Sequence, residues 1–226
     1  MRKQSKLLRW MMPLIGCCIC LNANADSNWS GNVAAEWLTF GKEALSNDQH
    51  RSYLSLSLEP DYHREWDRGK TWFTFEPFFR GNQFDSRRSH ADIRELHAGY
   101  AGNKWEFVAG ISKVYWGITE SQHLVDVINQ TDFVENADTE DKLGQPMLNA
   151  AYVADAGTLN LFILPYFRER TFAGKAGRPR AGLVIDQDNE IYESSNEQTH
   201  IDLAARWFQL IGDWEIGLSH FKGTSR

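Results

Sequence analysis

The sequence predicts an all-β protein built as one antiparallel sheet, and three observations support this fold class. Segments of strand length alternate apolar and polar residues, tight glycine-bearing turns join several of them, and an export signal precedes them all. An exported chain of this kind, with no long apolar run, is a candidate for a transmembrane β-barrel. Its mean hydropathy of −0.49 does not argue against a barrel, because lipid-facing and lumen-facing residues average out along each strand.

Residues 1–25 have the three parts of a signal peptide. Four basic residues come first, a mostly apolar run spans 7–21, and Ala23-Asn24-Ala25 is a cleavage site of small residues. We therefore expect cleavage after Ala25, and residues 26–226 as the mature chain. In the alternative interpretation, Leu14-Ile15-Gly16-Cys17 is a lipoprotein cleavage box that leaves Cys17 lipidated.

Nine strands are expected, in chain order. Segment 29–41 alternates weakly, whereas in 53–59 Leu54, Leu56 and Leu58 alternate with serines. Aromatic or aliphatic residues alternate with polar or small ones in the next three segments, 73–80, 95–100 and 105–112. Segments 146–154 and 157–168 are weaker, and clear alternation returns in 201–207 and 214–219. Most of these segments approach the 9–11 residues that a tilted strand needs to cross a bilayer.

The connections alternate in length, which predicts the orientation. Ala101–Lys104, Asp155–Gly157 and Gly212-Asp213 are tight turns, and long polar excursions cover 115–146 and 169–199. In outer-membrane barrels the short turns face the periplasm and the long loops face outward. Residues 60–70 fit this rule less well, because they are long for a periplasmic turn.

Aromatic residues support the same orientation, because they fall at one set of strand ends, as an interfacial girdle requires. These residues are Trp29, Tyr100, Trp105, Tyr152 and Trp214. The alternative is a periplasmic β-sandwich, in which large aromatics would cluster in mid-strand. Nine is an odd number, and closed single-chain barrels are even-numbered, so we expect the chain to be the N-terminal portion of a larger barrel that has been truncated.

The net charge of the mature chain argues against one class of partner. Removing the signal's four cations leaves 20 Lys+Arg against 30 Asp+Glu, a net charge of −10, which argues against nucleic acid as a partner. Charged residues on the polar strand faces are expected to line the pore. They are Glu76, Arg80, Glu95, His97, Glu106, Asp202, Arg206 and Glu215.

The two longest loops carry opposite charge, and such loops across a narrow lumen would sort solutes by charge. The alternative is that both are ordinary solvated surface. The expected constriction loop holds Glu120, Asp126, Asp132, Glu135, Asp138, Glu140 and Asp141. The expected opposing basic loop holds Arg168, Arg170, Arg178 and Arg180.

Trp116-Gly117 followed by Asp126-Val127-Ile128-Asn129-Gln130 resembles a pattern of porin-like outer-membrane β-barrel families of Gram-negative bacteria. In those families the stretch after the Trp-Gly strand end forms a loop associated with the pore. The resemblance covers about 30 residues. It departs from the families' pattern at Gln130, where a proline is usual, and the Pro-Glu-Phe-Gly-Gly loop of the general diffusion porins is absent from the sequence.

We therefore expect an outer-membrane porin-like channel for passive diffusion of small hydrophilic solutes. Its expected partners are membrane lipid and the solutes, and the channel could also form a homo-oligomer. Alternatives are an exopolysaccharide-type export pore or a non-conducting adhesin or assembly protein. We expect no enzyme, because Ser89-His90 and Ser219-His220 are only sequence neighbours, on opposite strand faces. No cofactor or metal is expected, since the acidic loop lacks the spacing of a calcium-binding EF-hand.

Overall fold

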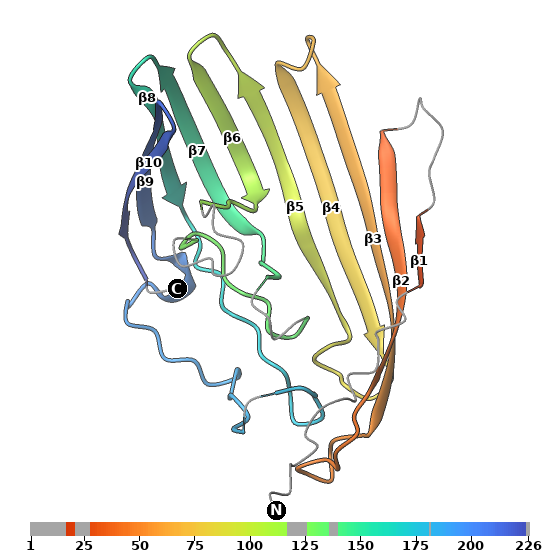
Figure 1. The fold of residues 1–226 in the computed structure, drawn as a ribbon. Coiled ribbons are helices and arrows are strands. Elements are labelled where there is room, and N and C mark those ends of the chain that lie inside the picture. Colours follow the sequence, from red (N-terminus) through yellow and green to blue (C-terminus); the bar gives the residue numbers. More distant parts are fainter. Residues whose placement is uncertain (1–16, 21–27, 117–125, 136–139, 181, 225–226) are drawn as a thin grey trace, which may run out of the picture.

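The computed structural model describes residues 17–20, 28–116, 126–135, 140–180 and 182–224, and these form one curved antiparallel sheet (Figure 1). The only helical element among them is a single 3-10 turn, Glu197–Thr199. In the described part of the chain, no helix is both long and apolar enough to cross a membrane. The prediction of an all-β chain is confirmed.

Every strand is hydrogen-bonded to its neighbours in sequence, so the sheet is a meander in the order β1 to β10. The strands are β1 Cys17–Cys20, β2 Trp29–Thr39, β3 Ser52–Trp66, β4 Thr71–Asn82, β5 His90–Ala101, β6 Trp105–Ser112, β7 Gln145–Ala154, β8 Gly157–Leu164, β9 Asp202–Ile211 and β10 Trp214–Lys222. The nine expected strands correspond to β2–β10.

The described sheet does not close into a barrel. Its two edges are β10 and the four-residue β1, which pairs with Asn32–Ala35 of β2. Because β1 lies inside the segment expected to be cleaved, removal of that segment would make β2 the edge. Strand β10 has most of both faces exposed, with Trp214 at 76% and Leu218 at 65%.

The short turns lie together at one end of the sheet and the long connections at the other (Figure 1). Residues 60–70, which looked too long for a tight turn, are mostly strand. β3 continues to Trp66, and Trp66 pairs directly with Thr71. The Gly69 N–H donates to the Trp66 carbonyl at 3.0 Å, and Asp67 and Arg68 both have positive φ, as a type I′ hairpin turn requires.

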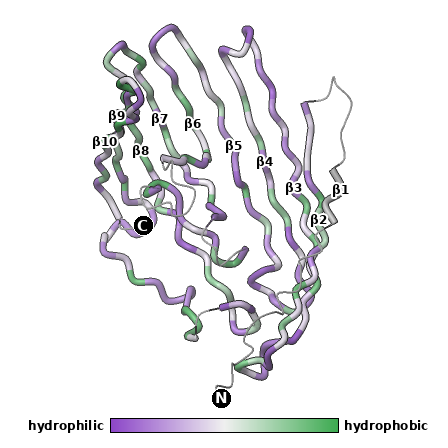
Figure 2. Tube along the Cα trace, in the orientation of Figure 1, coloured by the Kyte–Doolittle hydropathy of each residue, from purple (hydrophilic) through white to green (hydrophobic). Residues whose placement is uncertain are grey.

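Hydrophobic and hydrophilic residues follow one another along the strands (Figure 2), and their side chains differ in exposure between the two faces of the sheet. In β3 the apolar Leu54, Leu56 and Leu58 are 55%, 59% and 45% exposed, whereas Ser55 and Ser57 are 3% and 8% exposed. Soluble proteins bury the leucines of such a strand and expose its serines. Neighbouring strands extend this outward apolar surface through one register row, Phe73, Ala98, Ala109, Leu148, Ile163 and Leu203.

One β-bulge keeps this pattern intact where the sequence interrupts it. The β4–β5 register shifts at Glu76/Pro77, so that Glu76 pairs with Glu95 and Pro77 pairs with Ile93. Arg94 is the additional residue. It lies on the inner face next to Glu95, while Ile93 stays on the outer face.

Candidate functional site

The concave face of the sheet holds the described parts of the connection between β6 and β7, residues 113–116, 126–135 and 140–144, here named the inner loop. Ile128, which is fully buried, packs with Trp116 and with Met147, Phe162, Leu164 and Ala204 of β7, β8 and β9. These strand residues alternate with the exposed outward residues, so they face inward. The inner loop therefore folds onto the inner wall and does not project into the medium.

The Asp126–Gln130 motif fixes the two ends of this loop. The Asp126 carboxylate accepts a hydrogen bond from the Trp116 N–H. The Asn129 amide donates to the Ser112 and Leu143 carbonyls at 2.8 and 2.9 Å, and its oxygen accepts the Val114 N–H at 2.9 Å. Asn129 thus joins the end of β6 to the residues just before β7.

A buried ion pair attaches the acidic half of the loop to the wall. Asp132 is 1% exposed, and its Oδ2 lies 2.8 Å from Nη1 of Arg94, the bulge residue of β5. Its Oδ1 accepts the Thr171 hydroxyl at 2.5 Å and the Val134 N–H at 3.2 Å. Burial alone would raise the pKa of Asp132, but the Thr171 hydrogen bond and Arg94 bring that pKa below its ordinary value.

A second cluster surrounds Glu135. Arg80 on β4 contacts the Glu135 carboxylate at 2.7 Å and Glu36 of β2 at 3.0 Å. Arg88 also contacts Glu36 at 3.0 Å, and His90 lies 3.5 Å from Glu135. Burial raises the pKa of Glu135 above its ordinary value and outweighs the opposing effect of Arg80, Arg88 and His90.

Residues 165–180, here named the strap, cross the open end of the concave face from β8 to the β2–β3 connection (Figure 1). Arg170 donates to the Gln130 side chain at 3.2 Å, and Phe172 stacks on Phe133 at 5.7 Å. At the far side, the Ala176 carbonyl accepts the Tyr53 hydroxyl at 2.6 Å. The strap therefore covers the inner loop on the side of the long connections.

The predicted pore-lining residues all fall on the inner face, but their surroundings differ. Glu76 lies 3.5 Å from Lys113, and His97 lies 3.9 Å from Glu95. Asp202 is fully buried, with His200 Nδ1 at 2.6 Å. Glu106 is half-buried and Glu215 is exposed. The Arg206 guanidinium lies 5.7 Å from the centre of the Trp116 ring.

The predicted acidic and basic loops contact each other through Thr171 and Asp132 and through Arg170 and Gln130, but the ion pairs of Asp132 and Glu135 are made with the wall. Asp132 and Glu135 pair with arginines of β4 and β5, as described above. Arg168 instead pairs with Asp92 and donates to the Gly144 carbonyl, and Arg178 donates to the Lys42 and Glu43 carbonyls. Arg180 donates to the Gly182 carbonyl at 3.3 Å, Glu140 is exposed, and Asp141 is half-buried. Glu120 and Asp138 lie outside the described residues.

Four residues of the charged clusters on the wall were not predicted as site residues: Arg88 and Arg94, which contact the inner loop, and Glu36 and Asp92, which contact the arginines of these clusters. A signal for two of them is present in the sequence, since His90, Asp92 and Arg94 alternate with Ala91 and Ile93. That pattern places two charged side chains and a histidine on one strand face. The inner-loop partner of Arg94, Asp132, lies 38 positions away, which no local pattern can indicate.

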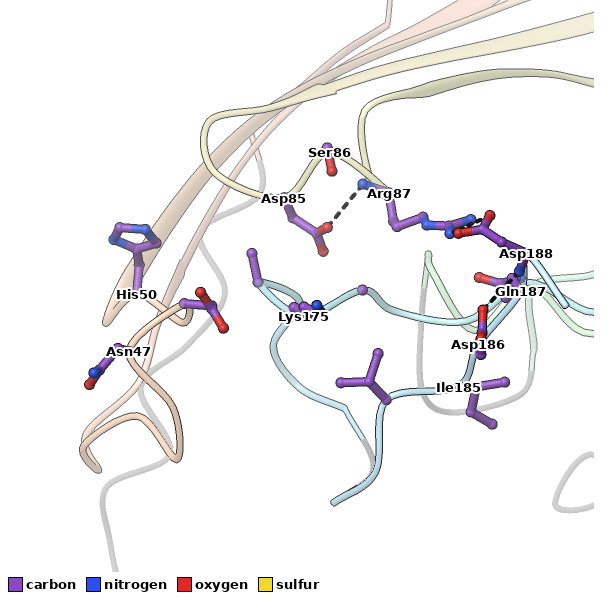
Figure 3. Close-up of a pocket in the computed structure, with 14 residues that line it drawn as sticks. Asn47, His50, Asp85, Ser86, Arg87, Lys175, Ile185, Asp186, Gln187 and Asp188 are labelled. Carbon is purple, nitrogen blue, oxygen red and sulfur yellow. Dashed lines mark hydrogen bonds and ion pairs between the residues drawn. The ribbon is translucent and has the colours of Figure 1, made fainter.

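At the end of the long connections, the β2–β3 and β4–β5 loops, the strap and residues 184–188 enclose a polar cavity of about 810 Å³ (Figure 3). Arg87 lies 3.3 Å from Asp188, and the Asp188 N–H donates to Asp186. Within the described ranges, no three His, Cys, Asp or Glu side chains are grouped as a metal site would require. No family model, curated protein or solved structure matches the chain.

Proposed function

We propose that the chain is part of an outer-membrane β-barrel channel through which small hydrophilic solutes diffuse passively, with the inner loop as its constriction. The single observation that carries this proposal is the polarity of the sheet. Exposed leucines of β3, β7, β8 and β9 face outward, and charged residues of β4 and β5 face a concave interior. An exposed apolar band is stable in lipid and is a liability in water.

The inner loop supports the channel assignment more specifically. It lies against the inner wall and carries charged residues there, and its attachment by buried ion pairs gives it a fixed position. Fixed charges in a narrow passage act on permeating solutes at short range, where salt screens them poorly.

Conductance in planar bilayers tests this proposal. The purified barrel, including the strands that close it, should give discrete single-channel steps, and Arg94→Met, which removes the ion-pair partner of Asp132, should give larger or noisier ones. Arg68→Met, on an exposed turn, is the control and should conduct like the wild type. The absence of steps from properly inserted wild-type protein would refute a diffusion channel.

A non-conducting barrel is the second candidate, because an apolar cluster around Trp116 and Ile128 occupies the inner wall over β7–β9. That packing would suit a plug. In this case wild-type protein should stay silent while Arg94→Met conducts.

A further inference from the structure

The outer face carries a second concave site at the end with the tight turns, away from the inner loop. A cavity of about 810 Å³ lies between the β3–β4 and β5–β6 turns. Its floor is formed by four outward-facing aromatic residues of β5, β6 and β7: Tyr100, Trp105, Phe107 and Tyr152. Two lysines, Lys70 and Lys104, complete its rim.

The aromatic floor is ordered by contacts between its own rings. The centres of the Trp105 and Tyr152 rings lie 4.7 Å apart. The Trp105 and Phe107 rings are nearly parallel and stack with their centres 5.9 Å apart. A Cβ on Gly102 would meet the Tyr100 ring at 3.5 Å, so the turn glycine lies close under that ring. About half of the surface of Tyr100, Trp105 and Phe107 remains exposed.

Both lysines are held at fixed backbone positions on either side of this floor. The Lys70 carbonyl accepts the Ala101 N–H at 2.7 Å, and the Lys104 carbonyl accepts the Val153 N–H at 2.8 Å. Both side chains are exposed, and among the described residues neither ammonium makes an ion pair. Two uncompensated cations therefore flank an apolar, aromatic surface.

Only some of the tight turns at this end of the sheet carry positive charge. The β3–β4 and β5–β6 turns contain three cations, Arg68, Lys70 and Lys104, and one acid, Asp67, whereas the β7–β8 and β9–β10 turns contain only acids, Asp155 and Asp213. An anionic amphiphile would fit the first pair of turns and be repelled by the second.

We propose that this cavity binds one glycerophospholipid of the periplasmic leaflet. Its phosphate lies between the ammonium groups of Lys70 and Lys104, and an acyl chain lies over the Trp105–Phe107 floor. Aromatic residues at a bilayer interface and lysines near lipid phosphates are individually favourable, and here they share one cavity. The inference rests on the proposed membrane insertion and does not depend on conduction.

The test measures lipid retention on the detergent-extracted protein by native mass spectrometry. The probes are palmitoyl-oleoyl phosphatidylglycerol and palmitoyl-oleoyl glycerol, which lacks the phosphate. Wild-type protein should retain one phosphatidylglycerol and little of the phosphate-free lipid. The double variant Lys70→Gln/Lys104→Gln should retain less by roughly fivefold for each lysine, about 25-fold in all. Lys42→Gln/Lys175→Gln, the same charge change at the opposite end, should behave like the wild type.

Three results would overturn the inference. They are equal retention by Lys70→Gln/Lys104→Gln and wild type, equal retention of both probes, and a lipid-free dimer that separates when the two lysines are changed. Conductance of the same samples distinguishes the two proposals. If the wild-type protein retains the lipid selectively but does not conduct, the channel proposal is refuted and the lipid site stands. If the protein is recovered in the soluble fraction and not in membranes, both proposals are refuted.

Discussion

The Asp132–Arg94 pair allows the sharpest test of how the inner loop is held. Asp132→Asn keeps the oxygen that accepts from Thr171 and Val134, but it presents an amide to the Arg94 guanidinium. Breaking a buried ion pair costs about 3–5 kcal/mol. Because Arg94 keeps Asp92 at 3.3 Å, we expect the lower end, about 3 kcal/mol.

Trypsin cleavage after Lys142 reports on this loss locally, because Lys142 is 9% exposed and becomes accessible only when the loop opens. A decrease of about 3 kcal/mol in the opening free energy corresponds to roughly 100-fold faster cleavage when opening is rapid. The control Asp213→Asn, in an exposed turn, should leave the rate unchanged.

A double-mutant cycle separates the pair from its surroundings. Arg94→Met in the Asp132→Asn background should cost much less than Arg94→Met alone, with a coupling free energy of about 2 kcal/mol in unfolding titrations. If the two changes add to within about 0.5 kcal/mol, or if cleavage in Asp132→Asn stays at the wild-type rate, the ion pair does not hold the loop.

Three further predictions concern the wall and its charges. Phe107→Arg places a cation on the outer apolar face and should cost about 2–4 kcal/mol in folding into lipid, whereas Glu106→Arg on the inner face should cost little; equal losses would refute the assigned faces. A Cβ on Gly99 would lie 2.1 Å from the Trp72 ring, so Gly99→Ala should destabilise the protein by about 1–3 kcal/mol in unfolding titrations. The same substitution should be tolerated in a Trp72→Ala background, and an equal effect in both backgrounds would contradict this packing. The raised pKa of Glu135 means that the folded protein binds this proton more tightly, so its stabilising effect grows as the pH falls and is lost as the pH rises through the folded-state pKa. Asp132 has the opposite sign, and its stabilising effect lasts until the pH falls through its lowered pKa. Reversal potentials in a salt gradient should therefore shift toward anions at mildly acidic pH, with the loop still attached, and Glu135→Gln should abolish the shift; an unchanged titration in Glu135→Gln would exclude this carboxyl.

The sequence by itself determined the strands and their faces. Residues on a strand point alternately to its two sides, so the repeat of Leu54, Leu56 and Leu58 is enough to assign a common face. It also placed the aromatic strand ends correctly, because Trp29, Tyr100, Trp105, Tyr152 and Trp214 all lie at the end with the tight turns. The outward direction of the leucines was an expectation from the export signal, and the described burial agrees with it.

Only the tertiary structure decided where the charges of the loops lie. The opposite net charge of the two long loops suggested that their charges oppose each other, whereas the ion pairs of Asp132 and Glu135 are with Arg94 of β5 and Arg80 of β4. Such contacts join residues 38 to 55 positions apart. They depend on the sheet's curvature and on a bulge that turns Arg94 inward beside Glu95. Alternation fixes the face of each strand residue locally, whereas a long loop has no such periodicity, so its partners are set by the three-dimensional surface onto which it folds.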